Sequence, residues 1–437
     1  MFKILNKIIL FILINLFTIN LLFSINRENI IYEDRVYSDK MKTVRMHKQE
    51  NEFSYPIIEL NSGEYLSFNF DNIGTINDYY YYTIVHCSYD WKPSNLYFFE
   101  YALGYEENEI RNYSDSRSTF IGYSHYELLL PNEDVQLKFS GNYLLIVYTK
   151  DGENEKIVCT KRFMIYENLV DVSGRINFVN NGLYRKTAQK LDFTINYKNY
   201  EIFIPEQEIK PVILQNYQWN NAIYNLTPSF LNNENIVYDW EEKTMFEASN
   251  EYRTFDIINL EFMGEHVQYI EFKNPYYYVD LQKDNSKLTT TYKKYNDFNG
   301  KYGIRTKRYK NNDFPEIQAD YVIVKFSFVY NIPLINSYIY IYGELTNYEL
   351  NDNYKMTYNK ETRCYEKLLF LKQGYYNYRY LSVNKEDNKI DHTLFEASFF
   401  DTENDYLLFI YHRNPRKSYD QLINFSIYNT NDKMIKN

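Results

Sequence analysis

Residue types that carry out catalysis are present in the chain, but they do not occur at the spacings that familiar reactions need. The sequence has no Gly-x-Ser-x-Gly turn for a serine nucleophile and no His-Glu-x-x-His for a catalytic zinc ion. It also lacks Cys-x-x-Cys, a phosphate-binding glycine loop and a dinucleotide fingerprint, and only 13 residues are glycine. These absences exclude the enzyme classes that carry such motifs, although not an enzyme with dispersed carboxylates.

The histidines and the paired acids are also poor candidates for chemistry. A metal site needs three or four converging ligands, and neighbours such as His86 and Cys87 point to opposite faces of a strand. The acidic pairs Glu133-Asp134 and Glu241-Glu242 are expected in loops, where adjacency does not hold two carboxyls across a glycosidic bond. We therefore predict a non-enzyme with no catalytic residue, cofactor, metal ion or small-molecule substrate. The scattered histidines are His47, His86, His125, His266, His392 and His412.

One aromatic segment has two interpretations. His86 to Trp91 is followed closely by Phe98 to Tyr101. The first interpretation is a strand end and a corner in which Trp91 fills a sandwich core, because large aromatic side chains dominate core energetics. The second is an aromatic recognition loop. We favour the structural interpretation.

The elements that position these residues are expected to be strands. The chain of 437 residues has 50 tyrosines and 30 phenylalanines, and aromatic residues fit a pleated, half-buried surface. An AT-rich codon bias also explains the excess, so the number of tyrosines alone does not indicate a ligand surface. At roughly 100–150 residues per domain, the length predicts three domains.

The N-terminus is typical of a signal peptide. Lys3 and Lys7 precede an apolar run from Ile8 to Phe23 that is short for a membrane span. An uncleaved anchor is the alternative. Removing these two lysines from the 48 basic residues leaves 46 against 58 acidic ones, a formal charge of −12. An acidic chain without a basic block is a poor partner for nucleic acid or anionic lipid.

Short strand-like runs separated by turns predict an all-β fold of tandem β-sandwich domains, of the immunoglobulin-like or early-set kind. Asp151-Gly152 between two apolar runs predicts a hairpin, and Lys310 to Asp313 predicts a linker. The expected strands are Tyr79–Cys87, Tyr143–Tyr148, Ile157–Phe163, Val170–Phe178, Leu191–Tyr197, Val212–Leu214, His266–Phe272, Tyr276–Leu281, Tyr321–Phe326, Tyr338–Tyr342, Cys364–Phe370, Tyr375–Val383 and Leu407–Tyr411. The expected segments are a signal peptide at 1–24, an N-terminal domain at 25–167, a middle domain at 168–313, a C-terminal domain at 314–413 and a tail at 414–437.

The cysteines leave two possibilities open. Cys87 and Cys159 both lie in strand-like runs of the first domain, and a disulfide between them is one possibility. The other is that these two and Cys364 are small buried apolar residues. An odd count in an exported protein leaves at least one thiol unpaired.

An ordered series of short motifs resembles the type IX secretion plug family across nearly the whole mature chain. In the first domain the motifs are Lys42-Thr43-Val44, Pro56 to Leu60, His86-Cys87-x-x-Asp90-Trp91, Pro131 to Asp134 and Ser140 to Tyr143. Further on they are Val212 to Asn216, Trp219 to Ile223, Asn250 to Asp256, Lys372 to Tyr378 and Glu403 to Tyr406. The resemblance implies a periplasmic protein, peripheral to the outer membrane, that binds the periplasmic mouth of a very large translocon barrel and closes it when idle. It supplies no catalytic, cofactor or interface residue.

The expected C-terminal domain has a second resemblance, to early-set domains related to glycogen- and starch-binding modules. Gly343-Glu344-Leu345-x-x-Tyr348, Met356 and Leu371 to Tyr376 carry it. An exported glycan-binding protein is therefore the alternative function. Those modules usually stack sugar on exposed tryptophan, whereas this sequence has Tyr348 at the corresponding position and no tryptophan in the domain.

The N-terminal sequence generates a first prediction. We expect the mature protein to begin near Ile25 and to be recovered outside the cytoplasm, because the charged start and interrupted apolar run direct export and cleavage. N-terminal sequencing or mass spectrometry of the native protein measures this. Retention of Met1 in a membrane pellet would contradict it.

Overall fold

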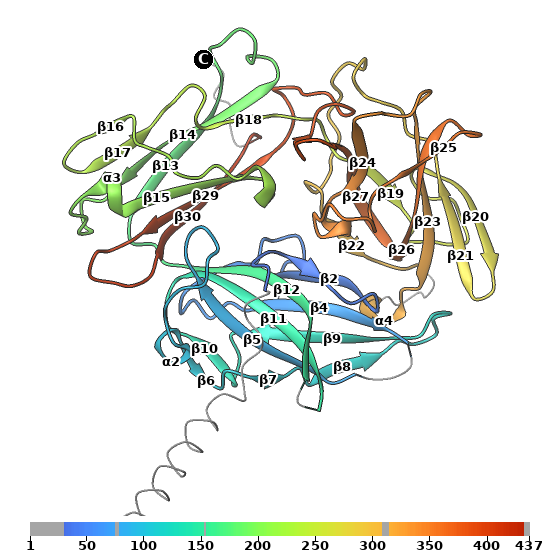
Figure 1. Cartoon of the computed structure of the whole chain (residues 1–437), viewed down its shortest axis with the longest axis horizontal. Coiled ribbons are helices and arrows are strands. Elements are labelled where there is room, and N and C mark those ends of the chain that lie inside the picture. Colours follow the sequence, from blue (N-terminus) through green and yellow to red (C-terminus); the bar gives the residue numbers. More distant parts are fainter. Residues whose placement is uncertain (1–29, 75–77, 153, 308–313, 432–437) are drawn as a thin grey trace, which may run out of the picture.

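Three β-sandwich units lie at the corners of a triangle (Figure 1). The computed structural model describes residues 30–74, 78–152, 154–307 and 314–431. The N-terminal unit is formed by 30–167, and the middle unit by 168–247 together with 403–431. The inserted unit, 248–402, lies between the two parts of the middle unit in sequence. The expected signal peptide is outside the described residues.

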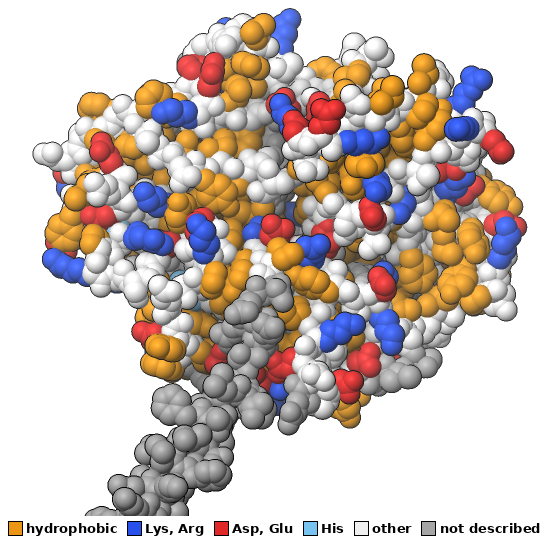
Figure 2. All heavy atoms as spheres, viewed as in Figure 1, with side chains coloured by type: hydrophobic (Ala, Val, Ile, Leu, Met, Phe, Trp, Pro, Cys, Tyr) orange, Lys and Arg blue, Asp and Glu red, His pale blue; other side chains and the backbone are white. Residues whose placement is uncertain are grey.

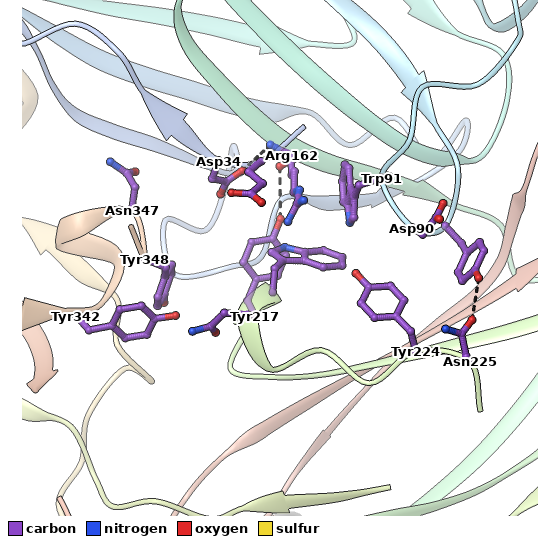
Figure 3. Close-up of a pocket in the computed structure, with 14 residues that line it drawn as sticks. Asp34, Asp90, Trp91, Arg162, Tyr217, Tyr224, Asn225, Tyr342, Asn347 and Tyr348 are labelled. Carbon is purple, nitrogen blue, oxygen red and sulfur yellow. Dashed lines mark hydrogen bonds between the residues drawn. The ribbon is translucent and has the colours of Figure 1, made fainter. Parts of the chain in front are cut away.

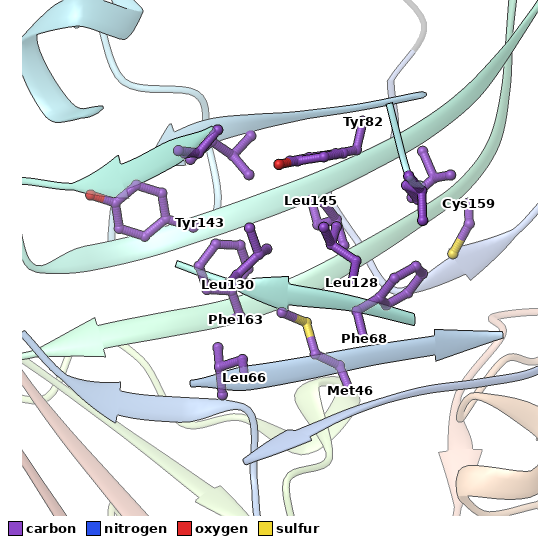
Figure 4. Close-up of a cluster of buried hydrophobic side chains, with 14 of the residues drawn as sticks. Met46, Leu66, Phe68, Tyr82, Leu128, Leu130, Tyr143, Leu145, Cys159 and Phe163 are labelled. Carbon is purple, nitrogen blue, oxygen red and sulfur yellow. The ribbon is translucent and has the colours of Figure 1, made fainter. Parts of the chain in front are cut away.

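The N-terminal unit packs a six-stranded sheet against a four-stranded sheet. Apolar residues on the facing sides interlock between them, as Figure 4 shows for Phe68, Leu128, Leu145 and Phe163. The predicted hairpin is present, since Asp151 pairs with Asn154 across the turn. The first sheet comprises β1 (Arg35–Val36), β3 (Ile57–Glu59), β5 (Tyr80–Cys87), β7 (Asn108–Glu109), β11 (Gly141–Asp151) and β12 (Asn154–Tyr166). The second comprises β2 (Met41–Lys48), β4 (Leu66–Ile73), β8 (Asn112–Asp115) and β9 (Tyr123–Leu130), and α2 (Phe98–Tyr101), β6 (Ala102–Gly104) and β10 (Val135–Leu137) complete the unit.

The middle unit combines strands that are far apart in the sequence. Its first sheet comprises β13 (Asp171–Phe178), β14 (Ala188–Asn196), β16 (Phe230–Leu231), β17 (Asn235–Tyr238) and β18 (Met245–Glu247). Its second sheet comprises β15 (Ile209–Gln215), β29 (Asp405–His412) and β30 (Gln421–Asn429), beside α3 (Pro205–Glu208) and η2 (Trp219–Asn221). Part of the expected tail at 414–437 is therefore not a tail, because β30 pairs with β29 along its whole length.

The inserted unit is also a sandwich of two sheets. One comprises β20 (Val267–Lys273), β21 (Tyr276–Leu281), β23 (Tyr321–Val329), β25 (Thr357–Asn359) and β26 (Cys364–Lys372). The other is centred on β27 (Gly374–Asn384), which pairs with β19 (Arg253–Asp256), β22 (Tyr302–Ile304), β24 (Ser337–Tyr342) and β28 (Ile390–Asp391). The helical turns are α4 (Pro315–Gln318) and η3 (Glu344–Thr346).

The expected boundaries at 314 and 414 differ from this arrangement. β19 and β22 precede residue 314 but hydrogen-bond to β27, which follows it. β15 similarly finds its partner in β29. Local sequence patterns cannot reveal such pairings, because the paired residues are separated by 70 to 203 positions and nothing in either run identifies the other. The expected linker Lys310–Asp313 lies outside the described residues.

The N-terminal and middle units are joined by an apolar cluster between two sheets. Leu144 and Ile146 on β11 project from the outer face of their sheet against Leu407 and Phe409 on β29, and all four are completely buried. Both sheets are thus covered on both faces, which explains why these runs are continuously apolar instead of alternating. Burying a side chain of this size contributes about 1.5–3 kcal/mol, so the cluster holds the two units firmly together.

The N-terminal and inserted units meet around a buried charge network. The Lys372 ammonium donates to the Asp71 carboxylate at 2.5 Å, and the Tyr321 hydroxyl donates to the same oxygen at 2.6 Å. His125 lies 2.7 Å from the other oxygen. Burial raises the pKa of Asp71, but Lys372 and His125 outweigh it and hold that pKa below its usual range. A buried charge pair contributes little net stability but penalises loss of one partner heavily.

The chain crosses between the middle and inserted units on two adjacent segments. The Thr402 hydroxyl donates to the Ser249 carbonyl at 2.8 Å, and the Arg379 guanidinium donates to the Ser249 hydroxyl at 3.0 Å. Across the boundary, the Gln189 amide of the middle unit donates to the Thr402 carbonyl at 2.9 Å, and the Gln218 amide donates to the Tyr252 hydroxyl at 2.8 Å. The outgoing and returning segments are therefore bonded both to each other and to the middle unit.

No disulfide links the cysteines, and all three are buried and free. Cys87 is paired opposite Asn142 and Cys159 opposite Val147, five residues apart along β11. At the strand rise this is about 17 Å, far beyond the reach of a disulfide. The two side chains also pack in different apolar clusters, on opposite faces of the sheet. The interpretation as small buried apolar residues is therefore the correct one.

His86 is buried among three tyrosine rings contributed by two units. The ring centroids of Tyr101, Tyr143 and Tyr419 lie 5.8, 5.1 and 5.5 Å from that of the imidazole. Burial lowers the pKa of His86 to about 4, against smaller raising effects from Ser140 and Asp420. The neutral ring thus belongs to the contact between the N-terminal unit and the β29–β30 loop.

We expect Lys372→Met to lower the free energy of unfolding by about 3–5 kcal/mol, because it leaves the Asp71 charge buried without its cation. Adding Asp71→Asn should recover part of the loss. Urea unfolding measures both. The exposed Lys273, which pairs with Glu271 at 2.7 Å, is the matched control, and Lys273→Gln should change nothing measurable. An equal effect of the two single lysine substitutions would contradict this account.

We also expect His86 to make stability depend on pH. Its folded-state pKa is depressed, so between pH 6.5 and 4 the unfolded chain binds a proton at this histidine whereas the native imidazole does not. The contribution is complete above pH 6.5, and about 3 kcal/mol of it is lost by pH 4. Urea unfolding at both pH values should show a steeper loss for the wild type than for His86→Phe. Parallel pH profiles for the two proteins would refute this role.

Candidate functional site at the junction of the three units

A cavity of about 440 Å³ opens where the three units meet. Figure 3 shows side chains from all three projecting toward its centre. Half of the wall is aromatic, and the remainder is acidic or amide side chains and one arginine. The lining residues are Glu33, Asp34, Tyr89, Asp90, Trp91, Arg162, Tyr217, Trp219, Asn220, Tyr224, Asn225, Tyr342, Asn347 and Tyr348.

Arg162, near the end of β12, is clamped at the centre of this site. Its guanidinium lies 4.5 Å from the ring centroid of Trp91 and 5.1 Å from that of Trp219. Its Nε and Nη2 atoms both donate to the Tyr32 carbonyl, at 2.9 and 2.5 Å. The two indoles pack edge to face, 5.0 Å apart. The clamp therefore holds an 8% exposed cation in one orientation between two units.

Five lining residues have backbone torsions that side chains disfavour. Trp91, Tyr217, Asn225, Asn347 and Tyr348 have φ between +50° and +63°. For bulky residues such as tryptophan and tyrosine this left-handed region is a genuine outlier. Strain of this kind costs of order 1–3 kcal/mol per residue and collects where a structure positions side chains for a purpose. Its concentration around one cavity marks the junction as a candidate functional site.

The charges around the cavity are largely paired. Asp34 contacts Lys161 at 2.9 Å, and Asp90 contacts Lys92 at 2.6 Å. Glu33 is exposed at the rim. Arg162 has no ion pair with a carboxylate in the part of the chain that the structure describes. The centre of the cavity therefore presents a fixed positive group, surrounded by acids of which Asp34 and Asp90 each have a lysine partner.

The structure changes the interpretation of Trp91 and Tyr348. Trp91 is 4% exposed, as a structural role requires, but it packs in the cluster between units and not in the sandwich core. Tyr348 is half-buried and packs edge to face on Tyr342 at 5.4 Å. It is not an exposed platform on the inserted unit. Both residues line the junction cavity, and both have positive φ values.

The histidines and acidic pairs that the sequence analysis considered for chemistry lie apart from one another. His412 pairs with Glu208 at 2.9 Å, His266 with Asp284 at 3.2 Å, and His125 with Asp71, each in a different place. The acidic pairs lie in turns, where Glu241 accepts from Asn180 and Asp134 contacts Arg111. Within residues 30–74, 78–152, 154–307 and 314–431, no three His, Cys, Asp or Glu side chains converge as a metal site requires.

Sequence reasoning missed Arg162, Tyr217 and Tyr224 as site residues. No local pattern singles them out, since each belongs to an ordinary strand or loop run. Tryptophan was the available signal: two of the chain's three tryptophans, Trp91 and Trp219, face the same cavity. The arrangement offers binding groups and no nucleophile poised beside a base, so it can recognise a ligand.

A known protein family and several solved structures match this chain. Residues 41–167 match the family described as type 9 secretion system plug protein 1st domain. A crystal structure of a hypothetical protein from Parabacteroides merdae is 34% identical, covering 92% of this chain and 100% of its own, with a TM-score of 0.87. A domain of the Streptococcus pyogenes antigen I/II-family protein AspA, which covers 88% of this chain and 98% of its own at 9% identity, has a TM-score of 0.15 and carries no argument. The curated proteins include no match.

Across the described residues, none of the helices has the length and apolar character needed to span a bilayer. The matched region corresponds to most of the N-terminal unit, which supplies Arg162 and Trp91 to the junction. The family is not one of known enzymes. Residues 41–167 therefore belong to the family described as type 9 secretion system plug protein 1st domain, and the chain as a whole shares its fold with the Parabacteroides merdae protein.

Proposed function

We propose that this protein is a periplasmic plug, which binds the periplasmic mouth of the type IX secretion translocon barrel and closes it sterically. The match to the plug family at residues 41–167 is the observation that carries the proposal. The protein acts without cofactor, metal or substrate, and it reaches the outer membrane through its partner. No catalytic step is needed, because a body that covers a pore stops flow by its volume.

The architecture supports a blocking role because it is stiff. Every unit contacts the other two: an apolar cluster joins the N-terminal and middle units, and a buried network around Asp71 joins the N-terminal and inserted units. Two chain crossings and hydrogen bonds from Gln189 and Gln218 join the middle and inserted units. A body closed in this way cannot swing open about a single hinge. Steric closure requires that property, whereas three sandwiches on free linkers would leave gaps.

The surface suits a reversible partner. Figure 2 shows acidic and basic side chains interspersed on one broad face, with hydrophobic atoms between them and no large area of one sign. A plug must leave when the channel is used, so we expect an interface of about 1,600 Å² with polar character. The acidic net charge would favour encounter with basic residues around the mouth more than it raises affinity.

The glycan-binding alternative has less support. Its best residue, Tyr348, lies in the junction cavity beside Tyr342 instead of presenting an open ring to solvent. The inserted unit contains no tryptophan at all. A sugar platform on that unit would need an exposed aromatic face that these residues do not provide.

We expect deletion of this protein to make the outer membrane permeable to large hydrophilic antibiotics while the translocon is still assembled. An uncovered wide pore admits solutes that the membrane normally excludes. Growth inhibition by vancomycin measures the effect. Deleting the barrel as well should restore the barrier, because no pore remains.

Return of the wild-type chain to the single deletion is the positive control, and it should restore resistance. A glycan-binding protein or an enzyme gives no reason for rescue by removal of the barrel. If the single deletion shows no leak although the barrel is present in the outer membrane, the plug role is wrong for this chain.

A further inference from the structure

We propose that the junction cavity is a peptide-binding site that recognises a carboxylate next to an aromatic or apolar residue, with Arg162 as the group that binds the carboxylate. Nothing in the plug role requires such a site. The proposal rests on the charge, geometry and lining of the cavity.

The first argument is the state of the Arg162 guanidinium. It is 8% exposed, faces the cavity in Figure 3, and has no acidic partner among the residues described. Its partners in the described chain are two indole rings and the Tyr32 carbonyl. Nη1 has no hydrogen-bond acceptor from the described chain. A buried cation of this kind gains most from an anion delivered by a ligand.

The second argument selects a carboxylate over a phosphate. Nε and one hydrogen of Nη2 are committed to the Tyr32 carbonyl, so the hydrogens of Nη1 and the second hydrogen of Nη2 remain for a ligand. This end-on pair matches the two oxygens of one planar carboxylate. Asp34, Asp90 and Glu33 surround the arginine, and their field opposes a dianion more than a monoanion.

The third argument selects a peptide over a sugar. The ring of Trp91 is covered by Arg162 and Trp219, and Tyr342 is fully buried, so neither offers its face to a pyranose. Tyr224 and Tyr348 instead form apolar sides around the cation. A volume of 440 Å³ lies within the range of small-ligand sites, roughly 300–1,000 Å³, and accommodates a terminal or acidic residue with one neighbour.

The experiment uses the two tryptophans as reporters. Trp240 lies away from the cavity in the middle unit, and Trp240→Phe in the full mature chain leaves Trp91 and Trp219 as the only tryptophans. Fluorescence titration then compares N-acetyl-L-phenylalanine, its amide, N-acetylglycine and maltose. We expect saturable binding of the acid, at least tenfold tighter than the amide, because the amide loses a charge-assisted hydrogen bond. N-acetylglycine should bind more weakly than the acid, and maltose should not bind.

The variants test the role of the guanidinium. Arg162→Gln should reduce the acid-to-amide affinity ratio to about one, and Arg162→Lys should leave an intermediate ratio because it keeps the charge and loses the clamp. Arg416→Gln, an exposed arginine that packs 5.0 Å from Phe203, is the matched control and should keep the wild-type ratio. Circular dichroism establishes that each variant is folded.

Several outcomes would overturn the proposal: equal affinities of acid and amide in the wild type, an unchanged ratio in Arg162→Gln, maltose binding without acid binding, or no binding of any probe. The comparison of acid and amide needs no substitution at Arg162, so a poorly folded variant does not obscure it. The isolated chain is sufficient for every measurement, so failure here leaves the plug proposal standing, and failure of the leak assay leaves this one standing.

Discussion

The structure depends on the burial of one sheet of the N-terminal unit on both of its faces. The inner face of β11 and its neighbours completes a sandwich core, and the outer face packs on β15, β29 and β30 of the middle unit. Each large apolar side chain buried there contributes about 1.5–3 kcal/mol, whereas a buried ion pair such as Asp71 with Lys372 roughly breaks even. The apolar cluster therefore holds the units together, and the charge network fixes how the inserted unit sits.

The cavity follows from that packing. Once two sheets are locked face to face and the inserted unit is tied at both crossings, the rounded edges of three sandwiches leave a space between them. Trp91, on a turn with positive φ, and Trp219, in η2, reach into it from two units and clamp Arg162. A relative movement of the units would therefore change the shape of the junction cavity first. A rigid plug and an occupied junction are compatible, because a ligand held there contacts all three units at once.

The positions of many strands could be predicted from the sequence, but which strands pair with each other could not. The run Val212–Leu214 indicated a central strand, and the structure places it in β15, buried on both faces. Its partner is Leu407–Phe409 in β29, and no local pattern could join the two, because an insertion of a whole unit lies between them. Trp91 was correctly expected to be buried, but its neighbours Arg162 and Trp219 come from distant segments, so the site itself could not be predicted. The family resemblance extended further than periodicity because it compares ordered motifs instead of contacts.

The central claim is that this chain seals the translocon, and affinity purification from detergent-solubilised envelopes tests it most directly. A tagged copy of the protein at its native level would be captured, and the bound proteins would be identified by mass spectrometry. The account predicts that an outer-membrane barrel of very high mass accompanies the tagged chain, with this protein at its periplasmic mouth in images of the complex. Recovery of the tagged protein without the barrel, from envelopes that contain the barrel, would contradict it.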